Sequence, residues 1–275
     1  MARPLIVGIV NITADSFSDG GRFLDPAAAI GHARALAAGG ADIVELGAAA
    51  SNVASAPVAP EEEIRRLAPV LAALAGAGMK LSIETWQPAV QRFALARGVD
   101  YVNDIRGFPD ASLYPELAAA ACRLVVMHAV DAEGGRARRR DLAGAEAWRR
   151  IEEFFAERIA RLAAAGIARH RLVLDPGMGL FLSSRAAASL YVLARLPLLR
   201  QRFGLPVMIS VSRKSFLAAV VGRQDPAERG PASLKAELYA AANGADYIRT
   251  HDPAALADGL AVTAGLAAAA PRQNA

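Results

Sequence analysis

The chain has 275 residues, of which 54% are hydrophobic and 21% charged, and its formal net charge is +4. This apolar fraction excludes a disordered chain, and the single cysteine, Cys122, excludes an intramolecular disulfide and a multi-cysteine zinc site. The small, diffuse positive charge does not indicate a nucleic-acid partner. The apolar runs are too short or too interrupted for a membrane span or a signal-peptide core, so we expect a cytoplasmic protein without a membrane partner.

Short apolar runs alternate along the chain with longer segments of helical spacing. The predicted strands are 5–10, 42–46, 81–83, 101–103, 124–127, 172–174, 207–210 and 247–248. The predicted helices are 27–38, 61–75, 89–97, 113–121, 145–165, 185–195, 215–221 with 234–243, and 254–268. Several of these helices open on proline and close on glycine, which are the residues favoured at those positions.

Apolar strands separated by helices are typical of a parallel sheet that is covered on both faces. About eight such units in a chain of this length predict an α/β fold of the (β/α)8 TIM-barrel type, as one domain over residues 1–275. A doubly wound open sheet is the alternative, but the first turn reads Asn11-Ile12-Thr13 and lacks a Gly-x-Gly-x-x-Gly motif. The long connections 11–25, 47–60 and 129–144 are predicted to be functional loops.

A polar or ionisable residue follows nearly every predicted strand, whereas the strand beginnings show no such pattern. These residues are Asn11, Glu45, Glu84, Asn103, Asp104, His128, Asp175, Ser212, Arg213, Lys214, Arg249, Thr250 and His251. Any one of them could be an ordinary loop or capping residue. Their coincidence at the strand ends, which meet at one mouth in a barrel, favours a binding site.

The types of these residues indicate the chemistry of the site. Carboxylates and an amide, as in Asp175, Glu84 and Asn103, suit the donor and acceptor edge of a nitrogen heterocycle. The cationic residues follow the last two strands, where barrels commonly bind phosphate. We therefore predict a site for a planar heterocycle beside a phosphate-bearing group. No Ser-His-Asp arrangement or His-x-x-x-His motif is found, and His32 and His170 are interpreted as structural.

Several motifs, in order along nearly the whole chain, resemble those of dihydropteroate synthases. They are Gly-Ile-Val-Asn-Ile-Thr at 8–13, Asp-Ser-Phe-Ser-Asp-Gly-Gly at 15–21, Asn-Asp-Ile at 103–105, Met-His at 127–128, Asp-Pro-Gly at 175–177, Ser-Arg-Lys-Ser-Phe at 212–216 and Arg-Thr-His at 249–251. Residues 49–52, 107–110 and 175–179, with Phe181, most resemble the mobile, sulfonamide-insensitive members of that family.

The resemblance implies a pterin-binding barrel that joins 4-aminobenzoate to 6-hydroxymethyl-7,8-dihydropterin diphosphate and releases diphosphate. It implies that the pterin is held by Glu84, Asn103, Met127, Asp175 and Lys214. It implies that the catalytic residues at the diphosphate are Asn11, Lys214, Arg249 and His251, with Asn11 also a ligand of Mg²⁺. It implies that the aminobenzoate is bordered by Ser51, Phe181, Ser212 and Arg213, and that the protein is a homodimer.

Two departures from the family pattern keep other functions open. Glu45 and Glu84 stand where the family usually carries aspartate, and the second loop reads Ala50-Ser51-Asn52 in place of a Ser-Thr-Arg-Pro-Gly run. The alternatives are a catalytically altered pterin-binding paralogue and a pterin-dependent methyltransferase, although the latter needs no diphosphate site. The altered loop and Phe181 lead to the hypothesis that sulfonamides fit the aminobenzoate pocket poorly.

Overall fold

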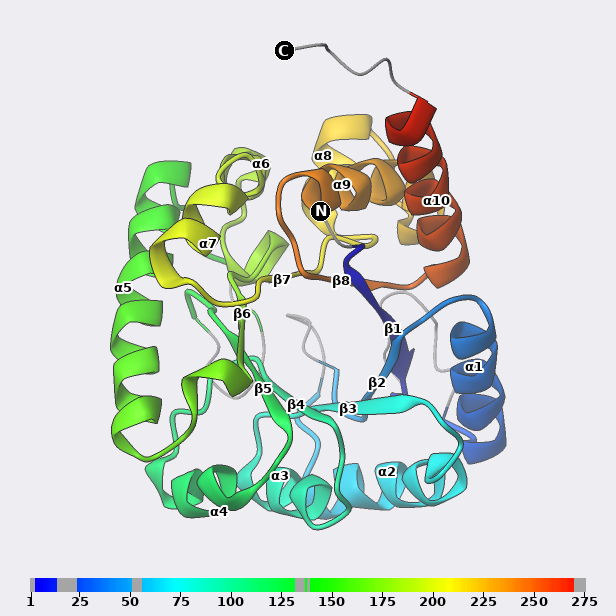
Figure 1. The fold of residues 1–275 in the computed structure, drawn as a ribbon, viewed down its shortest axis with the longest axis vertical. Coiled ribbons are helices and arrows are strands. Elements are labelled where there is room, and N and C mark those ends of the chain that lie inside the picture. The colour runs from blue at the N-terminus through cyan, green and yellow to red at the C-terminus, as the bar shows by residue number, and fades with distance from the viewer. Residues whose placement is uncertain (1–2, 14–23, 51–55, 132–136, 138, 270–275) are drawn as a thin grey trace.

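The computed structural model describes residues 3–13, 24–50, 56–131, 137 and 139–269. Within this part of the chain, eight parallel strands form one sheet in the order β6-β5-β4-β3-β2-β1-β8-β7. They are β1 (Leu5–Asn11), β2 (Ile43–Gly47), β3 (Lys80–Glu84), β4 (Tyr101–Asp104), β5 (Arg123–Met127), β6 (Leu172–Asp175), β7 (Met208–Ile209) and β8 (Tyr247–Thr250). Leu174 N donates to Pro206 O at 2.9 Å, and Leu174 pairs with Val207, so that β6 meets β7 and the sheet closes into a barrel (Figure 1).

This closed order confirms the predicted TIM barrel and excludes the doubly wound sheet, whose strand order reverses at a switch point. The strand ends differ in detail from the prediction. Asn11, Glu84 and Asp175 were expected to follow strands, but each is the last residue of one. The parallel ladders pair Asn11 with Gly47, Gly47 with Glu84 and Met127 with Asp175. The hydrogen bonds between strands join backbone atoms, so a strand can continue through a polar residue. A prediction based on apolar runs ends the strand before that residue.

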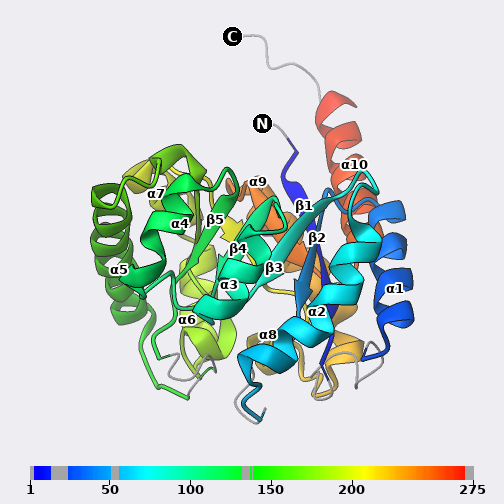
Figure 2. The ribbon, with the colours of Figure 1, turned by 90° about the horizontal axis from the view of Figure 1, so that it is seen from below.

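Helices surround the barrel and cover its outer face (Figures 1 and 2). They are α1 (Pro26–Ala38), α2 (Pro60–Leu74), α3 (Pro88–Leu95), α4 (Tyr114–Ala119), α5 (Gly144–Ala164), α6 (Ala186–Leu193), α7 (Leu196–Phe203), α8 (Ser215–Val221), α9 (Gly230–Ala242) and α10 (Pro253–Ala269). Short 3-10 turns include η4 (Gly179–Phe181) and η5 (Pro226–Arg229). None of the described helices combines the length and the hydrophobicity that a membrane span requires.

Helix α7 was missed by the sequence prediction, which ended the helical segment at residue 195. Its sequence nevertheless carries both boundary signals. Pro197 lies in its first turn, and Gly204 closes it in the left-handed conformation with φ 60°. The helix is only 8 residues long, and so short a segment contains too few turns for helical spacing to be distinguished from a loop.

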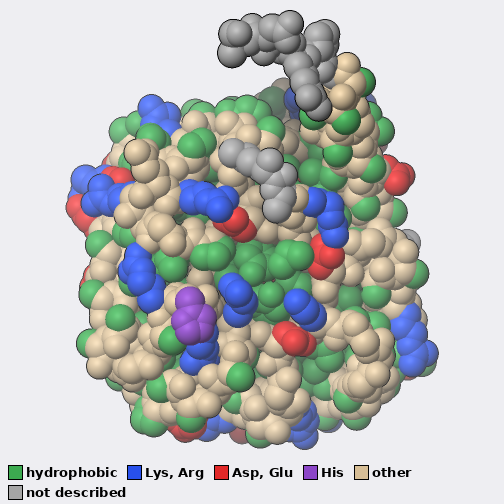
Figure 3. Space-filling view, viewed as in Figure 1, with side chains coloured by type: hydrophobic (Ala, Val, Ile, Leu, Met, Phe, Trp, Pro, Cys, Tyr) green, Lys and Arg blue, Asp and Glu red, His purple; other side chains and the backbone are tan. Residues whose placement is uncertain are grey.

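Three pairs of adjacent strands are joined near their amino-terminal ends by the same type of hydrogen bond. An aspartate that precedes one strand accepts a backbone N–H from the start of the adjacent strand at 2.8–2.9 Å: Asp42 from Ile6, Asp100 from Leu81, and Asp246 from Val207. Each of these aspartates follows a Gly-x pair in the sequence. Figures 1 and 3 view this face, where charged side chains surround a central hydrophobic group. The site described below lies at the opposite end of the barrel.

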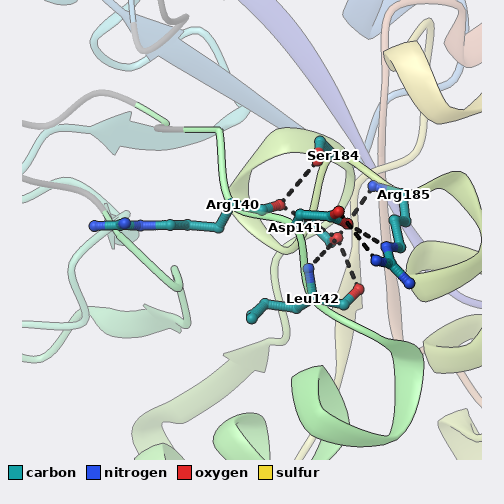
Figure 4. Close-up of polar contacts among 6 residues, drawn as sticks. Arg140, Asp141, Leu142, Ser184 and Arg185 are labelled. Carbon is teal, nitrogen blue, oxygen red and sulfur yellow. Dashed lines mark hydrogen bonds and ion pairs between the residues drawn. The ribbon is translucent and has the colours of Figure 1, made fainter.

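Residues 140–142, near the end of the 129–144 connection, form hydrogen bonds with the segment that follows η4 (Figure 4). Ser183 Oγ accepts from Leu142 N at 3.1 Å and donates to Leu142 O at 2.9 Å. Ser184 N donates to Arg140 O at 2.7 Å. The connection after β5 therefore supports the connection after β6, which carries η4 and its terminal Phe181.

Candidate active site

The interior of the barrel contains an apolar layer and, beyond it, a polar layer. The apolar layer is Val7, Ile43, Tyr101, Val125, Val173, Met208 and Tyr247. Successive side chains in a strand alternate between its two faces, so the residue two positions further on also points inward. On six of these strands that residue is Glu45, Asn103, Met127, Asp175, Ser210 or Arg249. The apolar layer therefore forms the floor of a polar site that opens at the carboxyl ends of the strands.

A buried ion network joins β2, β3 and β8 within this polar layer. Arg249 Nε donates to Glu45 Oε1, and Arg249 Nη2 donates to Glu84 Oε2. Glu45 has no exposed surface, and its Oε2 also accepts from Ser82 Oγ at 2.8 Å and from Asn103 Nδ2 at 3.1 Å. One guanidinium thus neutralises both of the glutamates at which this chain departs from the family pattern.

The second cation of the site, Lys214, lies on the β6 side. Lys214 Nζ donates to Met178 O at 3.2 Å and lies 5.5 Å from the centroid of the Phe181 ring. Asp175 Oδ1 accepts from Gly177 N at 2.8 Å. Lys214, which immediately precedes α8, therefore packs against the turn that follows β6, through Met178 and the aromatic ring of Phe181.

Burial and mutual attraction compete in setting the charges of these groups. Burial raises the pKa of Asp175 and of Glu84, while Lys214 lowers the pKa of the first and Arg249 that of the second. Burial lowers the pKa of Lys214 to about 8, against the opposing effect of Asp175. Burial would also lower the pKa of Arg249, but Glu84 and Glu45 outweigh it and raise that pKa. The pKa values of these four side chains therefore depend on one another, and a charged ligand in the site would shift them as well.

Two buried polar atoms near this network have no hydrogen-bond partner within the described residues. They are Asn103 Oδ1 and Thr13 Oγ1. Asn103 is 2% exposed and its amide nitrogen is already committed to Glu45. Buried polar atoms are nearly always paired in folded proteins, so an unpaired acceptor in this position indicates a place for a donor group of a ligand.

The ends of β7 and β8 bring a hydroxyl, an imidazole and a guanidinium to the mouth of the barrel. Ser212 Oγ lies 3.0 Å from His251 Nδ1 and accepts from His251 N at 3.2 Å. Arg213 takes the left-handed conformation with φ 57°, which is unusual for a residue with a side chain. Its backbone is held by Ser233 Oγ, which accepts from Arg213 N at 2.9 Å, and by Arg229 Nη1, which donates to Arg213 O at 2.7 Å. Such strain is kept where surrounding contacts enforce it, commonly at functional sites.

A cavity of about 220 Å³ connects these groups. The predicted site residues that line it are Asn11, Glu84, Phe181, Ser212, Arg213, Lys214, Arg249 and His251. The cavity also contacts apolar side chains, among them Ile9, Met178 and Leu180. An apolar pocket with convergent polar groups of both charges is what a flat, polar heterocycle with an anionic substituent requires.

Comparison with known proteins places this geometry in a family. A model described as a pterin binding enzyme matches residues 7–251. Dihydropteroate synthase type-2 of Escherichia coli is 58% identical over 262 residues, which cover 95% of this chain and 96% of the relative. The chain belongs to the dihydropteroate synthase family.

Solved dihydropteroate synthases share the fold over nearly the full chain. A Xanthomonas albilineans dihydropteroate synthase with 4-aminobenzoic acid aligns with a TM-score of 0.86 and 37% identity, covering 98% of this chain and 94% of that one. A Yersinia pestis dihydropteroate synthase in a sulfonamide complex aligns with a TM-score of 0.88 and 30% identity, covering 98% and 95%. Family membership confirms the resemblance that the sequence motifs indicated.

The structure gathers most of the site residues that were predicted for a dihydropteroate synthase. Asn103 and Asp175 do not line the cavity, but they interact with Glu45 and Lys214 of the polar layer. Met127 is buried and pairs with Asp175 across the β5–β6 ladder. Ser51, predicted to border the aminobenzoate, lies outside the described residues. The role of each residue stays a proposal.

Sequence reasoning assigned no role to three buried polar residues at or near this dihydropteroate synthase site. Glu45 was counted among the polar residues at the strand ends and as a departure from the family but was given no role, yet it connects Arg249, Ser82 and Asn103. Its position, two residues after Ile43 on the same strand, was the available signal. Thr13 was quoted only as the last residue of the 8–13 motif, and Glu237 was not singled out, because their burial depends on packing between segments far apart in the chain.

His128, part of the family's Met-His motif, is held as a neutral imidazole. It is 3% exposed, its Nδ1 lies 2.9 Å from Pro176 O, and its ring packs edge-on against Phe154. Neighbouring Gly177 has φ 71°, and an added Cβ there would meet His128 O. Burial lowers the pKa of His128 to about 4.

This lowered pKa makes the fold sensitive to acid. The stabilisation by neutral His128 is complete above the ordinary pKa near 6.5 and is lost as the pH falls toward 4. We expect the free energy of unfolding to fall by about 2 kcal/mol between pH 7.5 and pH 5 through this group alone. Urea unfolding of wild type and His128→Asn at both pH values measures it. The variant should lose that part of the pH dependence, and equal slopes in both proteins would contradict the assignment.

Proposed function

We propose that this chain condenses 4-aminobenzoate with 6-hydroxymethyl-7,8-dihydropterin diphosphate to form dihydropteroate and diphosphate. The observation that carries the proposal is the buried polar layer. It combines the amide of Asn103, whose Oδ1 is unpaired within the described residues, with the carboxyl groups of Glu45 and Asp175 and the ammonium group of Lys214. Carboxyl, amide and ammonium groups at fixed positions match the alternating donors and acceptors of a pterin ring. Asn103, Asp175, Lys214 and Glu84 would hold that ring, with Met127 packed beside it.

The anionic end of the substrate would face the β7 and β8 ends. Arg213 and His251 line the cavity there, and Lys214 and Arg249 also line it. Cationic groups and hydrogen-bond donors stabilise the charge that develops on a departing diphosphate. As the bond between the pterin methylene carbon and the diphosphate oxygen breaks, the cationic methylene carbon that remains is stabilised by the pterin ring and by the nearby carboxylates. The neutral aromatic amine then attacks that carbon and loses a proton, so positioning supplies much of the rate enhancement.

Mg²⁺ is part of the proposal through the diphosphate. Within the described residues no three His, Cys, Asp or Glu side chains gather into a metal site. Asn11, at the end of β1, lines the cavity and offers an amide oxygen. Mg²⁺ is commonly bound through one or two protein oxygens together with substrate phosphates, so this donor set fits. When bound, the ion would neutralise charge on the leaving diphosphate.

Complementation tests the proposal in the cell. A strain that lacks dihydropteroate synthase should grow without added folate-dependent nutrients when it carries this chain, and it should fail to grow with the Asp175→Asn variant. Failure of the wild-type chain to support growth, despite normal accumulation of folded protein, would overturn the proposed reaction. Repeating the experiment with a sulfonamide present separates a drug-sensitive enzyme from an insensitive one.

The proposal includes insensitivity to sulfonamides, which resemble 4-aminobenzoate but extend beyond it. Phe181 ends η4, lines the cavity and is supported by Val130 N, which donates to Phe181 O at 2.9 Å. We expect Phe181→Gly to bind sulfamethoxazole roughly tenfold or more tightly than wild type, because the ring that crowds the larger ligand is gone. Inhibition constants of the purified enzymes measure this. Phe93→Leu, on α3 away from the cavity, is the control, and strong inhibition of both wild type and Phe181→Gly would refute the steric role.

A homodimer completes the proposal. Large hydrophobic side chains are exposed on three neighbouring helices: Val220 and Val221 on α8, Tyr239 on α9, and Val262 and Leu266 on α10. Figure 1 shows these helices side by side on one flank of the barrel. Light scattering should give twice the 28.7 kDa chain mass, and Val262→Glu with Leu266→Glu should give monomers. Leu190→Glu on α6 is the control, and a dimer that survives the α10 changes would place the interface elsewhere.

A further inference from the structure

The connection between β7 and α8 brings consecutive residues to the same cavity. Ser212, Arg213, Lys214 and Ser215 all line it. Successive side chains of an extended strand point to opposite faces, so a straight strand would bring only alternate residues there. The chain turns instead. Lys214 N donates to Val211 O at 3.2 Å, and Arg213, the third residue of this turn, has φ 57°. The turn therefore allows two neighbouring cationic residues to line one cavity.

The backbone conformation of this turn is one that arginine does not favour. Among the described residues other than glycine, a positive φ occurs only at Phe108 and Arg213, so φ is negative at Ser212. A negative φ followed by a positive φ at the two central residues is the pattern of a type II turn, which usually has glycine or asparagine in third place. A residue with a Cβ atom takes this conformation at a steric cost. An arginine here therefore needs contacts that hold its backbone.

Two buried residues supply those contacts, and neither of them lines the cavity. Ser233 Oγ accepts from Arg213 N at 2.9 Å, and Arg229 Nη1 donates to Arg213 O at 2.7 Å. Ser233 Oγ also donates to Arg229 O at 2.7 Å, across one turn at the start of α9. Ser233 is 4% exposed and Arg229 is 2% exposed. Arg229 donates further to the backbone carbonyls of Arg223 and Gln224. Both backbone polar groups of Arg213 are thus held from outside the cavity.

We propose that Ser233 and Arg229 are positioning residues that hold Arg213 in the left-handed conformation, so that its guanidinium binds an anionic group of a substrate at the cavity. This inference rests on the proposed function, whose anionic groups are the carboxylate of 4-aminobenzoate and the diphosphate. A guanidinium has five N–H donors, so an anion can bind to it beside the contacts that Arg213 makes within the protein. Lys214 is also held by Met178 O, so loss of Ser233 should displace Arg213 more than Lys214.

Urea unfolding tests the enforced conformation without any ligand. Arg213→Gly and Arg213→Ala both remove the guanidinium and differ only at Cβ. With Ser233 in place, Arg213→Gly should have the higher urea midpoint, because glycine takes a positive φ without steric cost. When Ser233→Ala is added to each, the turn should relax, and the difference should vanish or change sign, because glycine loses more conformational entropy on folding.

Two results of this comparison would overturn the inference. One is an Arg213→Ala protein at least as stable as Arg213→Gly when Ser233 is present. The other is the same difference in midpoint with and without Ser233→Ala. If the Ser233→Ala protein does not fold, Arg229→Lys takes its place in the comparison, because it keeps the charge but loses the planar fork of donors that reaches Arg213 O.

Calorimetric titration tests what the conformation does for binding. Wild type and Ser233→Ala are titrated with inorganic diphosphate and Mg²⁺, with 4-aminobenzoate at saturating diphosphate, and with 6-hydroxymethyl-7,8-dihydropterin, which carries neither anionic group. One of the two anions should bind roughly five- to tenfold more weakly to Ser233→Ala, the size of one weakened charge-assisted hydrogen bond. The affinity for the pterin should stay close to that of wild type. The anion whose affinity falls is the one that Arg213 binds.

Asn243→Ala is the control for a general effect on α9. It removes a side-chain hydrogen bond to Tyr239 O at the other end of that helix, and it should bind all three ligands as wild type does. Unchanged affinity of Ser233→Ala for both anions would overturn the inference, and so would an equal loss for all three ligands. These measurements need no turnover, so a chain without synthase activity and a wrong role for Ser233 give different results.

Discussion

Replacing Arg249 with methionine is expected to lower the free energy of unfolding by about 3–5 kcal/mol and to abolish turnover. The physical reason is the ion network in the polar layer. Glu45 is fully buried and the Glu84 side chain is 13% exposed, and Arg249 donates to both. Without the guanidinium, two carboxyl groups remain buried with no cation between them. Urea unfolding at pH 7.5 measures the loss of stability.

Two further variants separate the charge effect from simple loss of packing. Glu45→Gln and Glu84→Gln, added to Arg249→Met, should restore more than half of the lost stability, because neutral amides need no counter-charge. The combined variant should stay inactive. Arg65→Met, in an ion pair with Glu62 whose arginine side chain is 73% exposed, should change stability by less than about 1 kcal/mol. A stable Arg249→Met protein, or no recovery in the combined variant, would contradict the account of the network.

Replacing Lys214 with methionine is expected to weaken binding of 6-hydroxymethyl-7,8-dihydropterin by roughly 100-fold, the cost of removing one partner of a buried charge pair. Lys214 lowers the pKa of Asp175 more than Arg249 does, against burial, which raises the pKa of that carboxyl group. Without Lys214, Asp175 should hold its proton more strongly and lose its value as an acceptor for the pterin. Calorimetric titration with this pterin, which lacks the leaving group, measures binding without reaction.

The pH dependence of the same titration provides a second check on Lys214. Its pKa of about 8 means that the ammonium form is lost as the pH rises through 8, so wild-type affinity should fall above that pH. Lys214→Arg, which keeps its charge, should bind more weakly at pH 7 but lose little on going to pH 9. Lys235→Met, at an exposed position on α9, should behave as wild type. Wild-type affinity in Lys214→Met would remove Lys214 from the pterin site.

Much of the fold was predictable from the sequence because the barrel depends on local patterns. Each β/α unit carries an apolar run, a helical segment and recognisable boundary residues, and the strands then pair in chain order. The polar residues at the strand ends also predicted the mouth of the barrel. Asn11, Glu84 and Asp175 were assigned to the right place even though the strands extend one residue further than expected.

The remaining features depend on contacts between distant segments. Arg249 was predicted to face the diphosphate, and it also binds Glu45, 204 residues away in the chain. The spacing of residues along the sequence does not show that Glu45 and Glu84 share the guanidinium of Arg249. Glu237 looked like an ordinary helical glutamate, and only the packing of α9 against β8 shows that it is buried.

The most direct test of the proposed function is the reaction of the purified chain with 6-hydroxymethyl-7,8-dihydropterin diphosphate, 4-aminobenzoate and Mg²⁺. Chromatography should show dihydropteroate and diphosphate released in equal amounts, and neither should form with Asp175→Asn. If wild type binds the pterin but releases no dihydropteroate, the polar layer is a pterin-binding site without synthase activity, and the proposed function is wrong.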